Sequence, residues 1–225
     1  MRSIHDARNC AKYPRLDHDS RENILKEQYL DTGRSCGEYL ELCSRTGYTI
    51  TELMVTAALL AISRYNGQSR VSIEWLYAGR AGGITHAIVG NLLCGIPCTV
   101  DLSAFGDFGK LLDEVKRQNA EGIQYADCSY AIADFKPVEE ERFKIVFEPR
   151  IKRMKQLPVP FERISIYDAL EGTPSVFSII AYKGMEEDHL SLILGYNAAL
   201  YDDESVTRFG GEYMKALDEC IEAIE

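Results

Sequence analysis

The sequence predicts an α/β fold, a two-layer sandwich in which helices pack against a largely mixed or antiparallel sheet. Two kinds of pattern lead to this prediction. Two segments have the form of a capping box ahead of an apolar helix, and several short segments alternate apolar and polar residues with a period of two. Helices and strands follow one another without strict alternation, which is typical of a mixed sheet with helices against it.

The first third of the chain contains two helices with clear start and stop signals. After a weak strand at residues 23–30, Ser35–Glu38 has capping-box form, and Gly47 can end the helix that it begins. Thr49–Glu52 repeats the form, and Gly67 can end the second helix. This second helix is apolar nearly all round, so we expect it to be buried at the centre of the fold.

Periodicity gives the remaining elements. Strands are expected at residues 71–77, 143–147, 163–167, 176–182 and 190–196, and helices at about 107–121 and from Asp202 or Asp203 onward. The short polar segment around Gly184 separates the last two strands, which therefore form a hairpin. We expect residues 1–225 to make a single domain with its own core.

Composition and charge exclude several classes of protein. The 225 residues are 46% hydrophobic and 27% charged, so disorder is not the main state. The 25 basic and 35 acidic residues leave a net charge of −10, which disfavours binding to nucleic acid or anionic lipid. The longest strongly apolar run, Leu53–Ile62, is too short to span a membrane.

The seven cysteines are read as reduced thiols of a cytoplasmic protein. Their number is odd, and residues 1–10 are polar where a secretory signal would be apolar. Cys94 and Cys98 have the spacing of half a zinc site, but no second Cys/His pair at ligand spacing supports one, so we expect no bound metal.

Residues that carry chemistry form no convincing catalytic set. The glycine-rich segment 78–83 lacks the patterns of a phosphate-binding or dinucleotide-binding loop, and the chain has no Gly-x-Ser-x-Gly elbow. His86 follows this segment and is either part of a functional loop or an ordinary surface residue. We therefore assign no catalytic residue from the sequence.

Several segments carry a family resemblance by their order and spacing. They are Tyr13-Pro14-Arg15, ITELMVTAALLAISRYNGQ at 50–68, VSIEWLYAGR at 71–80, IVGNLLCGIPCTVDL at 88–102, EGIQYADCSYAIA at 121–133, the strand at 143–147 and LSLILGYNAALY at 190–201. This run resembles the C-terminal half of the condensation domains of nonribosomal peptide synthetases, which belong to the chloramphenicol acetyltransferase-like superfamily. The resemblance implies a chloramphenicol acetyltransferase-like half-domain.

The chain departs from the family in its signature motifs. The family carries His-His-x-x-x-Asp-Gly in its N-terminal lobe, and no two histidines are adjacent here. Gly90–Cys94 lacks the usual Phe-Val-Asn-Thr, Ile123-Gln124 replaces His-Gln, and Cys128-Ser129 has no proline. The expectation is a C-terminal lobe that is separate from its catalytic N-terminal lobe and inactive alone.

The resemblance also implies a reaction and its partners. Condensation domains form amide bonds between acyl groups held on the phosphopantetheine arms of peptidyl or aminoacyl carrier proteins, in secondary-metabolite and antibiotic biosynthesis. The arms enter a tunnel between two lobes, and the irregular segment 149–174 is expected to cross to the N-terminal lobe. No cofactor is expected to bind directly. Without the N-terminal lobe, the face that would contact it is left uncovered, so we expect an exposed apolar surface or self-association.

Two alternatives stay open beside the condensation enzyme. The altered segments at 90–94 and 123–124 also fit a degenerate lobe that docks carrier proteins without catalysis. A related acyltransferase that uses free coenzyme A is the other alternative.

Four residues are candidates for substrate binding under this resemblance. Tyr77, at a strand end before the loop, is either a core or rim residue of the fold or a substrate-binding residue. Arg80 either pairs with a carboxylate of the fold or faces the tunnel. Asn91 and Gln124 are each either ordinary loop or element-end residues or polar groups of the tunnel wall.

Overall fold

A computed structural model of the chain describes residues 24–80, 83–90, 92–126, 143–148, 178–183 and 189–225. The strands are β1 Leu25–Ser35, β2 Arg70–Tyr77, β3 Cys94–Asp101, β4 Phe143–Glu148, β5 Ser178–Lys183 and β6 His189–Asn197. The helices are α1 Cys36–Thr46, α2 Ile50–Asn66, α3 Phe108–Gln124 and α5 Asp203–Glu222, with short 3₁₀ helices η2 Gly83–Ala87 and η3 Leu102–Ala104. The strand predicted at residues 163–167 lies outside the described residues.

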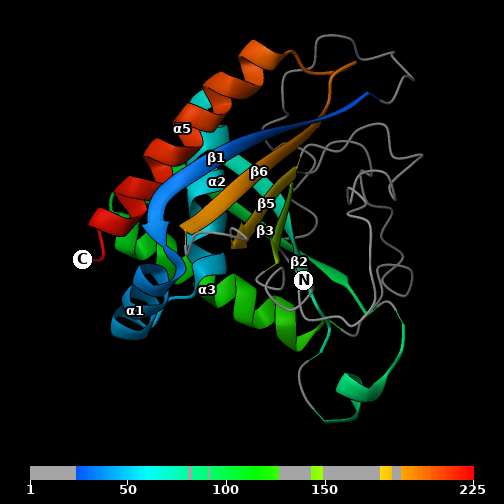
Figure 1. Cartoon of the computed structure of the whole chain (residues 1–225). Coiled ribbons are helices and arrows are strands. Elements are labelled where there is room, and N and C mark those ends of the chain that lie inside the picture. The colour runs from blue at the N-terminus through cyan, green and yellow to red at the C-terminus, as the bar shows by residue number, and fades with distance from the viewer. Residues whose placement is uncertain (1–23, 81–82, 91, 127–142, 149–177, 184–188) are drawn as a thin grey trace.

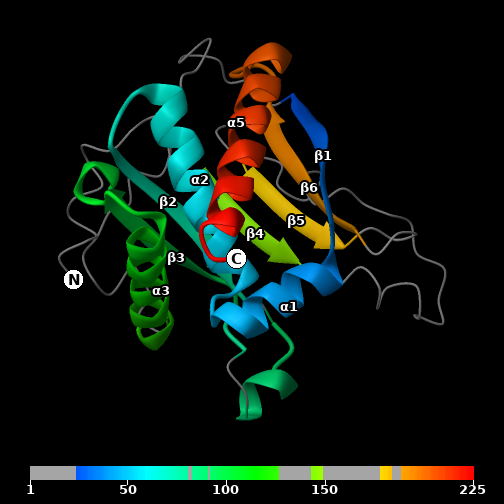
Figure 2. The same cartoon turned by 90° about the vertical axis from the view of Figure 1, so that its left-hand side faces the viewer.

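The strands form one mixed sheet in the order β1-β6-β5-β4-β2-β3. β4 runs parallel to both of its neighbours, β2 and β5, and the other three pairs are antiparallel. The helices α2, α3 and α5 lie together on one face of the sheet, as Figures 1 and 2 show. The predicted two-layer α/β sandwich is therefore confirmed, and so is the hairpin of β5 and β6.

Both predicted capping boxes are present. The Ser35 hydroxyl accepts a hydrogen bond from the Glu38 amide at 3.1 Å, and the Glu38 carboxylate accepts one from the Ser35 amide at 2.7 Å. Thr49 and Glu52 make the same exchange at 3.2 and 2.6 Å. These bonds satisfy amides at the helix starts that have no partner within the helix.

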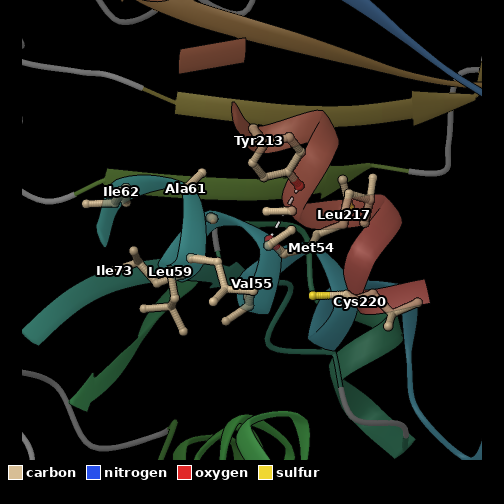
Figure 3. Close-up of a cluster of buried hydrophobic side chains, with 14 of the residues drawn as sticks. Met54, Val55, Leu59, Ala61, Ile62, Ile73, Tyr213, Leu217 and Cys220 are labelled. Carbon is tan, nitrogen blue, oxygen red and sulfur yellow. Dashed lines mark hydrogen bonds between the residues drawn. The ribbon is translucent and has the colours of Figure 1, made fainter. Parts of the chain in front are cut away.

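The core is built around α2. Every residue from Leu53 to Ile62 is buried, because the sheet lies on one side of this helix while α3 and α5 pack along its flanks. Figure 3 shows Tyr213 and Leu217 of α5 against Met54, and the Tyr213 hydroxyl donates to the Met54 carbonyl at 3.4 Å. The predicted central burial of this helix is confirmed.

The apolar stretch of α2 is thus accounted for by packing. Of the described residues, no single helix has the length and apolar character that a membrane crossing requires, and α1 with α2 meets the test only as a pair bent by 95°.

Helix α3 also completes the outer edge of the sheet. The Gln118 side chain accepts a hydrogen bond from the Thr99 amide at 3.0 Å and donates one to the Thr99 carbonyl at 2.8 Å. One side chain thereby supplies β3 with the donor and acceptor that a neighbouring strand would supply. Four residues later, Gly122 lies directly on Ile96, so the last turn of α3 rests on the start of β3.

Close packing at Gly122 predicts a specific cost for adding one methyl group. A Cβ atom there would overlap the Ile96 side chain, whereas at Gly211, on the exposed face of α5, it would meet nothing within 4 Å. We expect Gly122→Ala to lower the free energy of unfolding by about 1–3 kcal/mol, because α3 must move away from β3. Gly211→Ala, the control, should raise it by up to about 1 kcal/mol through helix propensity. Urea unfolding measures both, and equal effects would contradict the packing.

Candidate functional site

Three of the four candidate residues lie at one end of the sheet. β2 ends there at Tyr77, the connection to β3 leaves and returns there, and α3 ends there at Gln124. Figure 2 shows η2 projecting from this end, below α3 and α1. We call it the η2 end, made of residues 77–80, 83–90, 92–93 and 122–125.

The two ends of the connection lie close together where it leaves and rejoins the sheet. Gly79 has a positive φ of 64°, and a Cβ atom there would overlap the carbonyl oxygen of Leu92. Only glycine combines this backbone conformation with so close an approach. The outgoing and returning segments of the connection are therefore in contact at Gly79 and Leu92, one residue before Arg80 in the sequence.

Arg80 organises the connection through backbone carbonyls. Its Nη1 donates to the carbonyl oxygens of Thr85 at 2.7 Å and Ile88 at 3.0 Å, and its Nη2 donates to that of Gly90 at 2.9 Å. Among the described residues its hydrogen-bond partners are these carbonyls and not a carboxylate, a role that the sequence interpretations did not include. That Arg80 faces a tunnel stays a prediction.

Tyr77 sits at the rim of the core. It is half-buried, and its ring meets that of Trp75 edge to face, with centroids 6.0 Å apart and planes at 73°. The Trp75 indole is buried, and its N–H has no hydrogen-bond partner in the described part of the chain. The end of β2 therefore combines aromatic packing with one unused buried donor, and substrate contact by Tyr77 stays a prediction.

Gln124 and Asn91 differ in what the structure shows. Gln124 is exposed in the last turn of α3, between two exposed apolar residues, Ile123 and Tyr125. Asn91 lies outside the described residues. The fold therefore brings Tyr77, Arg80 and Gln124 to the same end of the sheet, and their role in substrate binding remains a prediction.

Five exposed apolar side chains belong to the segments that make up the η2 end, and the sequence-based candidates did not include them. Val89 is fully exposed, Leu93 is 58% exposed and Tyr125 is 63% exposed. We call the set the η2-end patch, consisting of Ile88, Val89, Leu93, Ile123 and Tyr125. Apolar residues within a glycine-rich connection were the available signal, since exposed large apolar side chains in a group mark interaction surfaces.

β3 contains two free cysteines, Cys94 at the η2 end and the buried Cys98 in the middle of the strand. Burial raises the pKa of the Cys98 thiol to about 12, so the group stays protonated and is a poor nucleophile at neutral pH. Cys94 Sγ lies 3.8 Å from the carbonyl oxygens of both Tyr77 and Leu92. Within the described ranges, no three or more His, Cys, Asp or Glu side chains form a group that could hold a metal ion.

Comparison with known proteins gives a family. The family model described as Condensation domain matches residues 33–225. A linear gramicidin synthase chain from Brevibacillus parabrevis is 22% identical over 187 residues, which cover 80% of this chain and 4% of that protein. The chain thus spans a small part of the curated relatives that it matches.

Solved structures agree with the fold. The epimerization domain from the third module of tyrocidine synthetase B has a TM-score of 0.67 at 15% identity, over 98% of this chain and 53% of that one. The condensation domain from the monacolin K polyketide synthase MokA has a TM-score of 0.70 at 14% identity, over 98% of this chain and 55% of that one. The fold is chloramphenicol acetyltransferase-like, and the chain spans about half of these solved chains.

The close contact between Gly79 and Leu92 predicts that an alanine at position 79 lowers the stability by more than its positive φ alone would. Gly33 has nearly the same φ, 68°, but a Cβ atom there would meet nothing within 4 Å. Gly33→Ala should therefore cost only the left-handed conformation, about 1–2 kcal/mol. Gly79→Ala should cost about 1–3 kcal/mol more, because the Leu92 carbonyl must also move. Urea unfolding of the two variants isolates the close approach, and equal losses of stability would show that the two segments are not in contact.

Proposed function

Because this chain belongs to the condensation domain family, we propose that it is the C-terminal lobe of a nonribosomal peptide synthetase condensation domain. The observation that carries the proposal is the extent of the match. Residues 33–225 match the family, whereas the chain spans only 53% of a solved epimerization domain of the same fold. The adjacent histidines of the family signature are absent from the sequence. The complete enzyme joins carrier-bound acyl and aminoacyl groups, and this lobe alone is inactive.

The proposed reaction depends mainly on positioning. The acceptor amine attacks the donor thioester carbonyl, the C–N bond forms, the C–S bond breaks, and the thiol of the donor phosphopantetheine arm leaves with a proton. Holding two tethered reactants together removes most of the entropic barrier, and a base must keep the amine unprotonated. We assign the base to the N-terminal lobe. The present lobe contributes one wall, with Tyr77, Arg80, Asn91 and Gln124 as candidate lining residues.

The N-terminal lobe is the proposed partner of the η2-end patch. The patch presents five apolar side chains at one end of the sheet, and about half of a complete two-lobe domain lies outside the matched length. Burying such side chains against a second lobe removes apolar surface from water, which is the main driving force of association. Without that lobe, the same surface accounts for the expected self-association.

Carrier proteins are the other proposed partners. They present their substrates on phosphopantetheine arms, so no cofactor needs to bind this lobe directly. With a net charge of −10, the chain attracts an acidic carrier only through a local patch. We propose a cytoplasmic enzyme of secondary-metabolite biosynthesis, as the names of relatives such as linear gramicidin synthase suggest.

A second candidate function is a lobe that docks carrier proteins without catalysis. The altered motifs favour it, since Gly90–Cys94 and Ile123-Gln124 depart from the family pattern. Both candidate functions require the same fold and the same partner surfaces, so only a measurement of amide formation distinguishes them.

Complementation tests the two candidates. The purified chain should form no amide between two loaded carrier proteins, because the proposed base lies on the other lobe. Addition of an N-terminal lobe that carries His-His-x-x-x-Asp-Gly should restore product, measured by mass spectrometry of the carrier-bound peptide. Binding of carriers without product would favour the docking lobe. Product formed by the chain alone would overturn both proposals.

Charged substitutions in the patch test the lobe interface. Val89→Asp combined with Leu93→Asp should weaken binding of the N-terminal lobe by at least about tenfold, because a charge would be buried in place of apolar surface. Ile24→Asp is the control, since Ile24 is 47% exposed at the opposite end of the sheet. Calorimetry measures the affinities of the wild type and both variants. Equal binding by the patch and control variants would place the interface elsewhere.

A further inference from the structure

Residues 83–90 form a short segment with a glycine at each end and mostly apolar residues between them, of which 83–87 are the single 3₁₀ helix η2. Most of its described side chains are exposed, and where η2 ends the Ile88 amide reaches the Thr85 carbonyl at a long 3.4 Å. Short segments of this kind sample many conformations in water unless another group restrains them. Val89, near the end of the segment, is fully exposed.

One side chain supplies the restraint. The three carbonyls that Arg80 binds belong to residues 85, 88 and 90, so a single planar group fixes both ends of the turn that carries Ile88 and Val89. A guanidinium offers several N–H donors in a fixed plane and remains charged at any physiological pH. The carbonyl dipoles converge on its positive charge.

The backbone position of Arg80 is fixed by the contacts at the start of the connection. Gly79 lies against the Leu92 carbonyl immediately before it, and the pairing of Tyr77 with Cys94 closes the strands below. The backbone that carries Arg80 therefore leaves the sheet at a fixed point, and its guanidinium reaches from there to the carbonyls of residues 85, 88 and 90.

We propose that Arg80 is a positioning residue that shapes residues 83–90 and so preorganises the η2-end patch for docking of the partner lobe. The identity of the partner rests on the proposed function, whereas the ordering of the segment does not. Preorganisation raises affinity because the segment loses less conformational entropy on binding.

Lysine does not replace arginine in this arrangement. The three carbonyls are shared between two nitrogens, with Thr85 and Ile88 on Nη1 and Gly90 on Nη2. A single ammonium nitrogen cannot occupy both positions. The planar geometry of the guanidinium, and not its charge alone, therefore provides the restraint.

Hydrogen exchange on the full chain tests the ordering. In Arg80→Ala, amides of residues 83–93 should exchange at least about tenfold faster, while amides of α2 and α5 keep their wild-type protection, because only the local restraint is lost. Arg80→Lys should resemble Arg80→Ala. Guanidinium chloride at about 20 mM, far below denaturing concentrations, should slow the exchange in Arg80→Ala, and methylammonium chloride should not. Arg45→Ala, in the last turn of α1 at the same end, is the matched control and should leave residues 83–93 unchanged.

Any one of three results would overturn the proposal. They are unchanged exchange of residues 83–93 in Arg80→Ala, wild-type exchange in Arg80→Lys, and an equal loss of protection in α2 and α5. Affinity for the N-terminal lobe provides the second readout, expected to fall in Arg80→Ala and to recover with guanidinium. Failure of the wild-type chain to bind that lobe would reject the proposed function, and the exchange result would still decide the role of Arg80.

Discussion

The central constraint on this structure is that the middle of α2 is apolar nearly all round, so none of its faces can be exposed to water without cost. Ten consecutive residues, Leu53–Ile62, are buried, so the helix must be covered by the sheet below and by α3 and α5 along its flanks. The Tyr213 hydroxyl binds the Met54 carbonyl within this contact, which leaves no polar group of that tyrosine side chain unused. The two-layer arrangement follows from covering one helix on all sides.

The same arrangement creates the η2 end. Because α2 occupies the middle of the helix layer, α3 packs beside it over β3 and ends where the β2–β3 connection projects. Tyr77, Arg80 and Gln124 come from a strand, a connection and a helix, and all are delivered to that end by the order of the chain. The same end exposes several large apolar side chains, which are typical of interaction surfaces.

Local signals predicted the fold better than they predicted the site. Ser35 and Thr49 mark helix starts because their partners lie three residues away, so the pattern is visible in the sequence. The order of the strands depends on contacts between distant segments, which no local pattern contains. The role of Arg80 was missed for a related reason, since its partners are backbone carbonyls and every residue has one. The resemblance identified the family, but it could not say which side chains shape the exposed segment.

Gln118 has a consequence for how this protein behaves at high concentration. A strand from another molecule could pair with the Thr99 backbone of β3 only by breaking its two hydrogen bonds with Gln118. The β3 edge is thereby protected at this position against intermolecular sheet growth, a common route to aggregation and amyloid. A protein that also exposes apolar side chains gains from such protection, because a strand that pairs at β3 must then compete with a hydrogen-bonded side chain.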